Sequence, residues 1–492
     1  MGGDRVAHRP FPGRTALILL LAFLFGCAGL ARPLPSTGGA APAPPPAPEP
    51  PSPGLPARGG TPLPPPPAPP PIRTVVRVTL GAVGDVLMQD AVKRSAEAHA
   101  SEAPDGGYSW LFAPVADLLA QPDLTFANLE SPVAPAASTG SRPFVFDAPP
   151  EAIAALRRAG IGLVSVANNH ALDQGRAGLE ETVRWLEAGG LPQVGAGVGP
   201  RRAGPVRLER KGLSLAFLAY TYGLNQGGNA CPAERPACVQ VSELDRERIV
   251  EDVRAAAAGA DAVVVSIHWG TEYQPQPRAE DVELAHRLAD AGALVLLGHH
   301  PHVLQPVELY RRPDGRTAVI AYSLGNFVSN QSRGFVPGVT PDAVAATRDG
   351  VLLRVALERR DYGRGVTRVE VAGADVLPLW TENDTAEIDP RREPARRPAI
   401  RVVADERALA EVRADLARLP DPVPAGAEGR FVLLRQREAL YAARRAAAGA
   451  VLGEDQLRTL AARELARPGA GAAPDAAAAA PAAGRATPSA GP

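Results

Sequence analysis

The sequence predicts an α/β fold on the basis of two observations. From Val75 onward, short runs of β-branched or aliphatic residues alternate with Ala/Leu/Arg-rich stretches of helical character. Six of the apolar runs are followed directly by polar side chains. Because open α/β sheets bind ligands at the carboxyl ends of their strands, the second observation also locates the expected functional site.

Composition indicates that the α/β region is only part of the 492-residue chain. The chain has 53 Pro and 49 Gly but only 4 Trp, and 19 of the prolines fall between Pro33 and Pro71. Basic and acidic side chains number 52 and 53. This near balance argues against a protein that coats nucleic acid or acidic membranes, so no nucleic-acid partner is expected.

Residues 1–27 have the features of an export signal. Arginines precede the apolar run Ala16–Phe25, which is about half as long as a membrane-spanning helix. The Leu-Phe-Gly-Cys sequence at residues 24–27 resembles a bacterial lipobox, in which the cysteine becomes lipidated. We expect an exported lipoprotein, anchored to a membrane of the cell envelope through Cys27 and facing the periplasm or the exterior. Simple secretion and an uncleaved anchor are the alternatives.

Residues 28–72 form the expected linker. Proline lacks an amide donor and fixes φ, so a segment this rich in proline favours extended polyproline II over helix or sheet. At about 3.1 Å per residue, the segment from Pro33 to Pro71 would extend on the order of 100 Å. A proline-rich ligand for a partner domain is the alternative, but only composition supports it.

Export also accounts for two of the three cysteines. Cys231 and Cys238 flank a short Pro-containing loop, and an oxidising compartment favours a disulfide between them. Two free thiols remain the alternative.

The polar clusters that end the expected strands carry the chemistry. The apolar runs are Val75–Val83, Leu124–Ala127, Leu163–Ala167, Ala262–Ile267, Leu294–Leu297 and Ala318–Tyr322. The clusters that follow them are Gly84-Asp85, Asn128-Leu129-Glu130, Asn168-Asn169-His170, His268-Trp269-Gly270, Gly298 to His302, and Ser323 to Phe327.

Histidines concentrate in these clusters. Five of the eight histidines follow an expected strand, namely His170, His268, His299, His300 and His302. We expect the other three, His8, His99 and His286, to be structural or solvent-facing.

The donor types in these clusters favour a divalent metal. Carboxylates, an amide and imidazoles without thiolates suit Mn, Fe or Zn and disfavour copper(I) and iron–sulfur chemistry. Six or seven donors exceed one tetrahedral site, so we expect two ions bridged by a carboxylate. Alternatively, Asp85 occupies a turn, Asn169 caps a helix and the histidines lie in hydrogen-bonded loops. This alternative leaves the His-Pro-His sequence unexplained.

Taken in order, the clusters resemble the motif series of the CapA family, the capsule or poly-gamma-glutamate biosynthesis proteins of the calcineurin-like metallophosphoesterase superfamily. Further residues that fit the series are Asp173, Gly175, Glu272, Tyr273 and Gln305. The resemblance covers about Val75 to Trp380. It implies a metallophosphoesterase-like sandwich of two mixed β-sheets flanked by helices.

The resemblance also implies roles for individual residues. Its metal ligands correspond to Asp85, Glu130, Asn169, His268, His300 and His302, with His299 the less favoured of the clustered histidines. His170 corresponds to the general acid that protonates a leaving group. Trp269, Glu272, Tyr273 and Asn326 are expected to line the substrate groove; packing is the alternative, and it is strongest for Trp269.

Two positions depart from the wider superfamily. Its first motif has a histidine where Leu87 stands, so one metal site loses a ligand, and Glu130 stands where an aspartate is usual. These changes leave the occupancy of the second metal site and ordinary phosphatase activity open.

The motif series defines the expected domains. We assign residues 73–382 to the CapA-type domain and 383–466 to an appended helical region containing the helices Ala404–Leu419 and Phe431–Leu465. Residues 467–492 are rich in Ala and Pro with few large apolar side chains, so we expect disorder there.

The leading hypothesis is a metal-dependent, phosphoesterase-like hydrolase acting in the synthesis, release or anchoring of a cell-surface polymer. The expected partners are anionic poly-gamma-glutamate or capsular polysaccharide, a membrane reached through the lipid anchor, and capsule-assembly membrane proteins. A non-catalytic polymer-binding or assembly component with the same fold is one alternative. A general secreted metallophosphatase is another.

Overall fold

The computed structural model describes residues 72–140, 142–199, 204–388, 391, 395–424 and 426–453. The chain divides into two units, and all described residues belong to the second, Ala68–Pro492. The predicted export signal, Cys27, nearly all of the linker and the C-terminal tail lie outside the described residues. Within the described part, no helix combines the length and apolarity that a membrane crossing requires.

The first of two large sheets has eight strands in the order β16-β15-β14-β1-β2-β3-β4, with β13 paired to β1 off this path. Its strands are β1 (Arg73–Val86), β2 (Leu124–Leu129), β3 (Ile161–Ser165), β4 (Gln193–Val194), β13 (Asn326–Val328), β14 (Asp349–Asp361), β15 (Thr367–Asn383) and β16 (Ile400–Ala404). The strands β1 to β4 run parallel, whereas β14, β15 and β16 are antiparallel.

The second sheet has six strands in the order β11-β12-β10-β9-β7-β6. They are β6 (Val206–Arg210), β7 (Leu213–Thr221), β9 (Ala262–His268), β10 (Ala293–His299), β11 (Val307–Arg311) and β12 (Thr317–Ala321). Parallel pairs join β7, β9, β10 and β12, and antiparallel strands form both edges. A separate two-stranded sheet pairs β5 (Ala196–Val198) with β8 (Val239–Val241).

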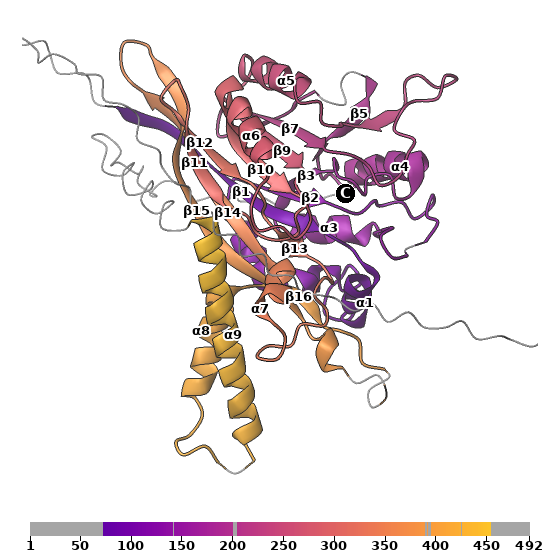
Figure 1. The fold of residues 1–492 in the computed structure, drawn as a ribbon, viewed down its shortest axis with the longest axis vertical. Helices are drawn as coiled ribbons and strands as arrows, with labels where there is room; N and C mark the ends of the chain where they lie inside the picture. The colour runs from indigo at the N-terminus through magenta and orange to yellow at the C-terminus, as the bar shows by residue number, and fades with distance from the viewer. Residues whose placement is uncertain are drawn as a thin grey trace, which may run out of the picture. The chain divides into compact units, whose positions relative to one another are not determined.

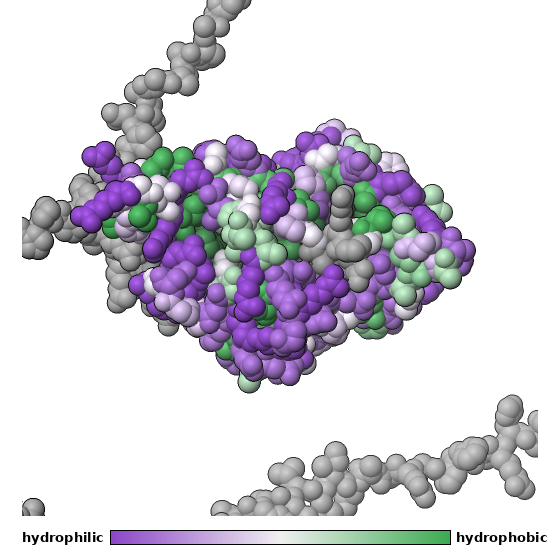
Figure 2. Space-filling model, turned by 90° about the horizontal axis from the view of Figure 1, so that it is seen from above, coloured by the Kyte–Doolittle hydropathy of each residue, from purple (hydrophilic) through white to green (hydrophobic). Residues whose placement is uncertain are grey.

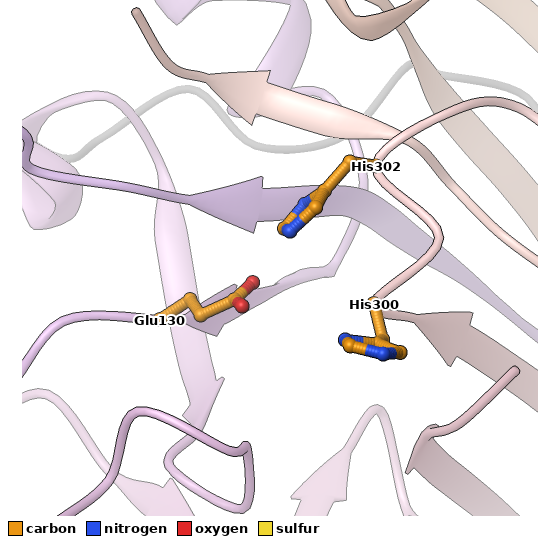
Figure 3. A group of neighbouring side chains, drawn as sticks. All are labelled: Glu130, His300 and His302. Atoms are coloured by element: carbon orange, nitrogen blue, oxygen red, sulfur yellow. The ribbon is translucent and has the colours of Figure 1, made fainter. Parts of the chain in front are cut away.

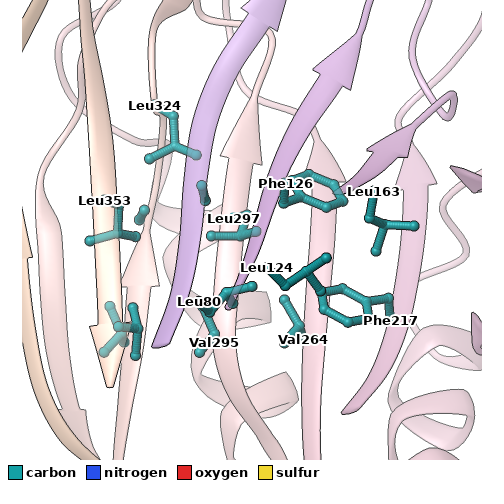
Figure 4. Packing of buried hydrophobic residues seen from close by; sticks show 14 of the residues in the cluster. Leu80, Leu124, Phe126, Leu163, Phe217, Val264, Val295, Leu297, Leu324 and Leu353 are labelled. Carbon is teal, nitrogen blue, oxygen red and sulfur yellow. The ribbon is translucent and has the colours of Figure 1, made fainter. Parts of the chain in front are cut away.

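The two sheets pack face to face through a shared apolar core. Side chains of β1, β2 and β3 meet side chains of β7, β9 and β10 between the sheets (Figure 4). The ring centroids of Phe126 and Phe217 lie 6.3 Å apart across this interface. Strands in the middle of each sheet are buried on both faces, which explains why they read as continuous apolar runs.

Helices flank both sheets (Figure 1). They are α1 (Asp90–Ala98), α2 (Ala116–Leu119), α3 (Glu151–Arg158), α4 (Gly175–Ala188), α5 (Arg248–Ala257), α6 (Ala279–Ala291) and α7 (Asp342–Ala345). The buried faces of α1 and α3 pack on the first sheet, and those of α5 and α6 pack on the second. The predicted α/β class, with two mixed sheets flanked by helices, is therefore confirmed.

Two C-terminal helices, α8 (Asp405–Ala417) and α9 (Glu428–Leu452), pack against each other and against β15 (Figure 1). The helical region also contains β16, which pairs with β15, so the first sheet continues beyond residue 382. The predicted domain boundaries stay predictions. The predicted helix Phe431–Leu465 begins at Glu428, and its last part lies outside the described residues.

Surface character is mixed on the face in Figure 2, where hydrophobic residues appear in separate patches among hydrophilic ones. This pattern accords with the near balance of charge in the sequence.

Parallel pairing brings the predicted polar clusters to one edge of the sandwich. Asp85 is in register with Asn128 of β2 and with Asn326 of β13, and His268 is in register with His299. Backbones approach closely at this edge. A Cβ atom at Gly84 would lie 2.0 Å from the Gly325 carbonyl oxygen, so only glycine fits directly before Asp85.

Candidate metal centre

The structure brings the six predicted metal ligands together at the carboxyl ends of both sheets. Asp85 lies near the end of β1, Glu130 directly follows β2, and Asn169 lies in the loop after β3. His268 ends β9, and the loop after β10 carries His300 and His302. All six are at least nine-tenths buried.

Two groups of potential ligand atoms share Glu130. One group is Glu130, His300 and His302, and the other is Asp85, Glu130 and His268; within each, the ligand atoms all lie within 4.8 Å of one another. Figure 3 shows the Glu130 carboxylate and the two imidazole rings turned toward a common space. Glu130 therefore occupies the position from which a carboxylate can bridge two ions.

The backbone of the His-Pro-His segment is unusual. His300 has φ 96° and His302 has φ 58°, in a region that side chains other than glycine seldom adopt. Such conformations cost on the order of 1–3 kcal/mol each and persist where surrounding contacts impose them. Here the strained backbone directs both imidazole rings toward Glu130.

Both carboxylate oxygens of Asp85 contact residues of the histidine cluster after β10. Its Oδ1 lies 3.0 Å from His299 Nδ1, and its Oδ2 accepts a hydrogen bond from the His300 backbone amide at 3.1 Å. Burial alone would raise the pKa of Asp85, but hydrogen bonds from His299 and His302 hold the pKa well below its usual range. His299 thus supports Asp85 rather than joining either ligand group.

Glu130 is buried, and no lysine or arginine among the described residues pairs with it. Burial, and next the charge of Asp85, raise the pKa of Glu130 well above its usual range. Its Oε1 has no hydrogen-bond partner among the described residues. Buried carboxylate oxygens are normally bonded, so this orphaned atom is the observation that best fits a bound cation.

Burial favours the neutral form of two imidazoles at the site, His268 and His300. Burial, and next the neighbouring His300, lower the pKa of His268 well below its usual range. Burial, and next His302, lower the pKa of His300 to about 4. Neutral imidazole has a free lone pair, and His300 Nδ1 is buried without a partner. The donor set therefore suits a borderline divalent ion such as Mn, Fe or Zn.

Three amides brace these groups. Asn128 Nδ2 donates to Asp85 Oδ1 at 2.9 Å and lies 3.4 Å from Glu130 Oε2. Asn169 Oδ1 lies 2.9 Å from His268 Nε2. Asn326 Oδ1 lies 3.0 Å from His302 Nδ1 and, at 1% exposed, stands behind that histidine. The expectation that Asn326 lines the substrate groove is thus corrected: its contacts position His302.

His170 stands at the side of the site. Its Nδ1 lies 2.7 Å from Asp173 Oδ2, and its Nε2 lies 4.0 Å from Glu130 Oε1. Phe146 packs against the ring at a centroid distance of 4.3 Å. Asp173 therefore fixes the ring so that Nε2 faces the centre.

Of the remaining predicted groove residues, Glu272 and Tyr273 are exposed at the rim, and the Tyr273 ring lies 6.1 Å from that of His302. Trp269 is 1% exposed, donates from Nε1 to the Tyr322 carbonyl oxygen and packs with the helices on the second sheet. Its expected place in the groove was wrong, because its side chain points into the core.

Sequence reasoning missed two residues after β7. The ring of Tyr222, which is 46% exposed, lies 4.6 Å from that of His300, and Asn225 Nδ2 lies 3.4 Å from His170 Nε2. The rule that polar residues follow strand ends would have found both, since Tyr222 directly follows β7. They were missed because neither residue is a typical metal ligand.

The segment after β7 is fastened to α4. A disulfide joins Cys231 to Cys238, the pairing expected from the sequence. Arg176 of α4 donates to Cys238 Sγ and to the Ala230 carbonyl oxygen, both at 2.5 Å.

Of the histidines expected to be structural, His99 stacks on Trp110 and His286 stacks on Tyr310. His8 lies outside the described residues.

Comparisons with known proteins point in one direction. The family described as "Bacterial capsule synthesis protein PGA_cap" matches residues 79–331, which include every residue of the centre. Relatives include "Capsule biosynthesis protein CapA" of Bacillus anthracis, 30% identical over 309 residues that span 62% of this chain and 67% of that protein. "PGA biosynthesis protein CapA" of Bacillus subtilis is 30% identical over 302 residues, spanning 60% and 72%.

Among solved structures, the 5'-nucleotidase of Candida albicans SC5314 is a distant likeness. It is 8% identical, with a TM-score of 0.31, over 58% of this chain and 48% of that one. The sandwich described above rests on the strand pairing of this chain itself.

Proposed function

The chain belongs to the bacterial capsule synthesis protein family PGA_cap, and from this premise we propose that it acts in making a capsule or poly-gamma-glutamate polymer. Both Bacillus relatives are named for that biosynthesis. Synthesis, release and anchoring of the polymer all fall within the proposal.

The proposed chemistry is metal-dependent hydrolysis or transfer at a phosphoester or related acyl bond. One observation carries it: Glu130 Oε1 and His300 Nδ1 are buried without partners where two carboxylates converge. Within the described residues, no lysine or arginine pairs with Asp85 or Glu130. In this part of the chain, the two carboxylates therefore have histidines but no lysine or arginine beside them.

The residues that would hold divalent ions are Asp85, Glu130, Asn169, His268, His300 and His302, and Glu130 belongs to both groups of potential ligand atoms. When bound there, two such ions would polarise a phosphoryl or acyl oxygen and lower the pKa of water to near neutrality. Tyr222, Glu272 and Tyr273 would contact the substrate around the centre.

His170 would protonate the leaving group from Nε2. Asp173 orients the ring through Nδ1, as a carboxylate does in other acid–base pairs. Asn225 lies against the same Nε2 and would position the group that receives the proton.

A non-catalytic polymer-binding protein is the second candidate. Leu87, which is 1% exposed, stands where the wider superfamily has a ligand, so the centre has one donor fewer. A site with one ion would still bind anionic polymer. The His170–Asp173 pair has no obvious role in such a protein.

We propose further that the chain is exported and lipid-anchored at Cys27. The strand β1 runs from Arg73 to Val86, and Asp85 lies near its far end, so about 40 Å of strand separates the start of the domain from the centre. A linker attached before Arg73 therefore enters at the end of β1 away from the metal site. Replacing Cys27 with serine should release the protein from membranes.

The test compares leaving groups in full-length protein. His170→Asn should reduce turnover of alkyl phosphoesters about 10²- to 10⁴-fold while barely affecting aryl esters, whose leaving groups need no proton. His302→Ala should abolish turnover of both and remove metal. Equal losses on both ester types in His170→Asn would contradict the general-acid role. If neither variant affects turnover or surface polymer in a deletion strain, the catalytic proposal fails.

A further inference from the structure

An apolar cavity lies beside the metal centre, between α9 and the loop that follows the metal-site histidines. Its volume is about 600 Å³, within the range of about 300–1,000 Å³ typical of ligand pockets. Aliphatic side chains dominate its lining, including Val303, Leu304, Ala346, Ala447, Ala448 and Val451.

The cavity and the metal centre share a wall. Val303 and Leu304 directly follow His302 in the chain, and Tyr273, which also lines the cavity, lies against the His302 ring. Behind His302, Asn326 Nδ2 donates at 2.9 Å to Gln331 Oε1, another lining residue. A ligand that spans both spaces would therefore pass Tyr273.

The polar groups at the cavity already have partners within the protein. Among the described residues that line it, Arg444 is the only basic one, and its guanidinium forms two hydrogen bonds to the Asp349 carboxylate. Ser332 Oγ and Thr347 Oγ1 bond to each other at 2.6 Å. An anionic polymer would find no cation here, whereas an apolar chain would leave every one of these bonds intact.

We propose that this cavity binds the aliphatic chain of an amphiphile whose anionic head group lies at the metal centre. The placement of the head group rests on the proposed function; the binding of the chain rests on the cavity alone. Each methylene buried favours binding about fourfold, so burying four of them predicts roughly 100-fold or more.

The test titrates the full chain, purified without detergent and loaded with Mn²⁺, with methylphosphonate and with decylphosphonate below its micellar concentration. Calorimetry should give a Kd at least about 100-fold lower for the decyl compound. Ala447→Trp, which fills the cavity from α9, should reduce this ratio below tenfold without changing metal content or methylphosphonate affinity. Ala443→Trp, at an exposed position on the same helix outside the cavity, should leave the ratio unchanged.

A second filling variant guards against a folding defect. Val344→Trp enters from the opposite wall at a position that is 41% exposed, and it should reduce the ratio in the same way. Equal affinity for the two phosphonates in the wild type overturns the proposal, as does a ratio that survives both filling variants.

The same titration separates this proposal from the proposed function. Decyl-chain binding that Ala447→Trp removes, in a protein that holds no metal and ignores methylphosphonate, would support the cavity and refute the metal centre. Tight binding of metal and methylphosphonate without any preference for the longer chain would support the metal centre and refute the cavity proposal.

Discussion

Two buried acidic clusters in this protein differ in whether an arginine of the chain compensates their negative charge. Beneath α9, Asp349 receives both of its hydrogen bonds from Arg444, so the chain supplies the compensating charge. At the strand ends, Asp85 and Glu130 receive only imidazole, amide and backbone groups, and Glu130 Oε1 receives nothing. Arg444 thus compensates the Asp349 carboxylate from within the chain, whereas the second cluster fits a cation from outside.

The difference between the two clusters shows that the partners of a buried carboxylate indicate whether it is structural or available to a ligand. Burying a charge is costly unless a partner compensates it, and burial raises the pKa of Asp349 to about 6 although Arg444 acts to lower it. In a site that binds a cation, no arginine or lysine of the chain pairs with the buried carboxylates, so their oxygens are available to the cation. An unpartnered carboxylate oxygen beside an unpartnered imidazole nitrogen, Glu130 Oε1 and His300 Nδ1, therefore distinguishes the metal centre better than acidic composition does.

The largest expected effect comes from breaking the cluster that Arg444 compensates. Arg444→Leu leaves Asp349 buried and unpaired, so the free energy of unfolding should fall by about 3–5 kcal/mol in urea denaturation. Arg435→Leu, which removes an exposed pair with Glu438 on the same helix, should have a much smaller effect. A similar loss in the two variants would contradict the assignment of Arg444 as internal compensation.

Chelation should have the next largest effect, and only at the cluster at the strand ends. A protein with free metal at 100 times its Kd gains about 2.7 kcal/mol, so EDTA should lower its stability by about that amount. Because the Asp349–Arg444 pair uses no metal, chelation should destabilise Arg444→Leu and wild type equally. Stability that does not respond to EDTA would argue against a metal at the centre.

A smaller effect is expected from removing Asn326, whose amide positions the predicted metal ligand His302. Asn326→Ala removes the amide that positions His302, and such partners typically change metal affinity 10- to 100-fold. Competition with a metal-binding dye would measure this change. Asn330→Ala, whose amide oxygen bonds to Asn383, serves as the control and should leave metal affinity unchanged.

The smallest expected effect concerns Asp405, a buried carboxylate that in the described part of the chain has neither an arginine partner nor a place among the metal ligands. Neither carboxylate oxygen of Asp405 has a hydrogen-bond partner among the residues that the structure describes. Burial, and next the charge of Asp349, raise the pKa of Asp405 well above its usual range. A raised pKa stabilises the fold below pH about 4, and that stabilisation is lost as pH rises. Asp405→Asn, which cannot ionise, should thus gain stability relative to the wild type as pH rises above about 4, by on the order of 1 kcal/mol.

Urea denaturation across this pH range measures the gain. Asp415→Asn, at a partly exposed position on the same helix, should show no comparable trend. A difference between Asp405→Asn and wild type that is constant with pH would show that Asp405 does not change protonation.

Much of the fold and the centre could be predicted from the sequence. Strands buried on both faces produce continuous apolar runs, and a parallel strand places its next residues at the ligand edge, which is why Asp85, Glu130 and His268 were identified. Runs of this kind do not reveal which strands share a sheet. The division into two sheets came from the family resemblance rather than from periodicity.

What the sequence could not indicate depends on side-chain direction and distant contacts. Trp269 follows His268 directly but faces the core, and period-2 alternation along a strand end does not say which face is which. Tyr222 reaches His300 from a different strand. The apolar cavity exists because α9 packs beside the loop after His302, more than a hundred residues earlier in the chain.

Elemental analysis of the purified full-length protein tests the central claim most directly. After growth with Mn, Fe and Zn and dialysis against buffer, the wild type should retain at least one equivalent of a divalent metal, and a bridging Glu130 predicts two. Glu130→Gln, which keeps the shape of the side chain, should lose most of that metal, while Glu308→Gln on β11 should keep it. A folded wild type without stoichiometric metal, or an unchanged metal content in Glu130→Gln, would contradict the account.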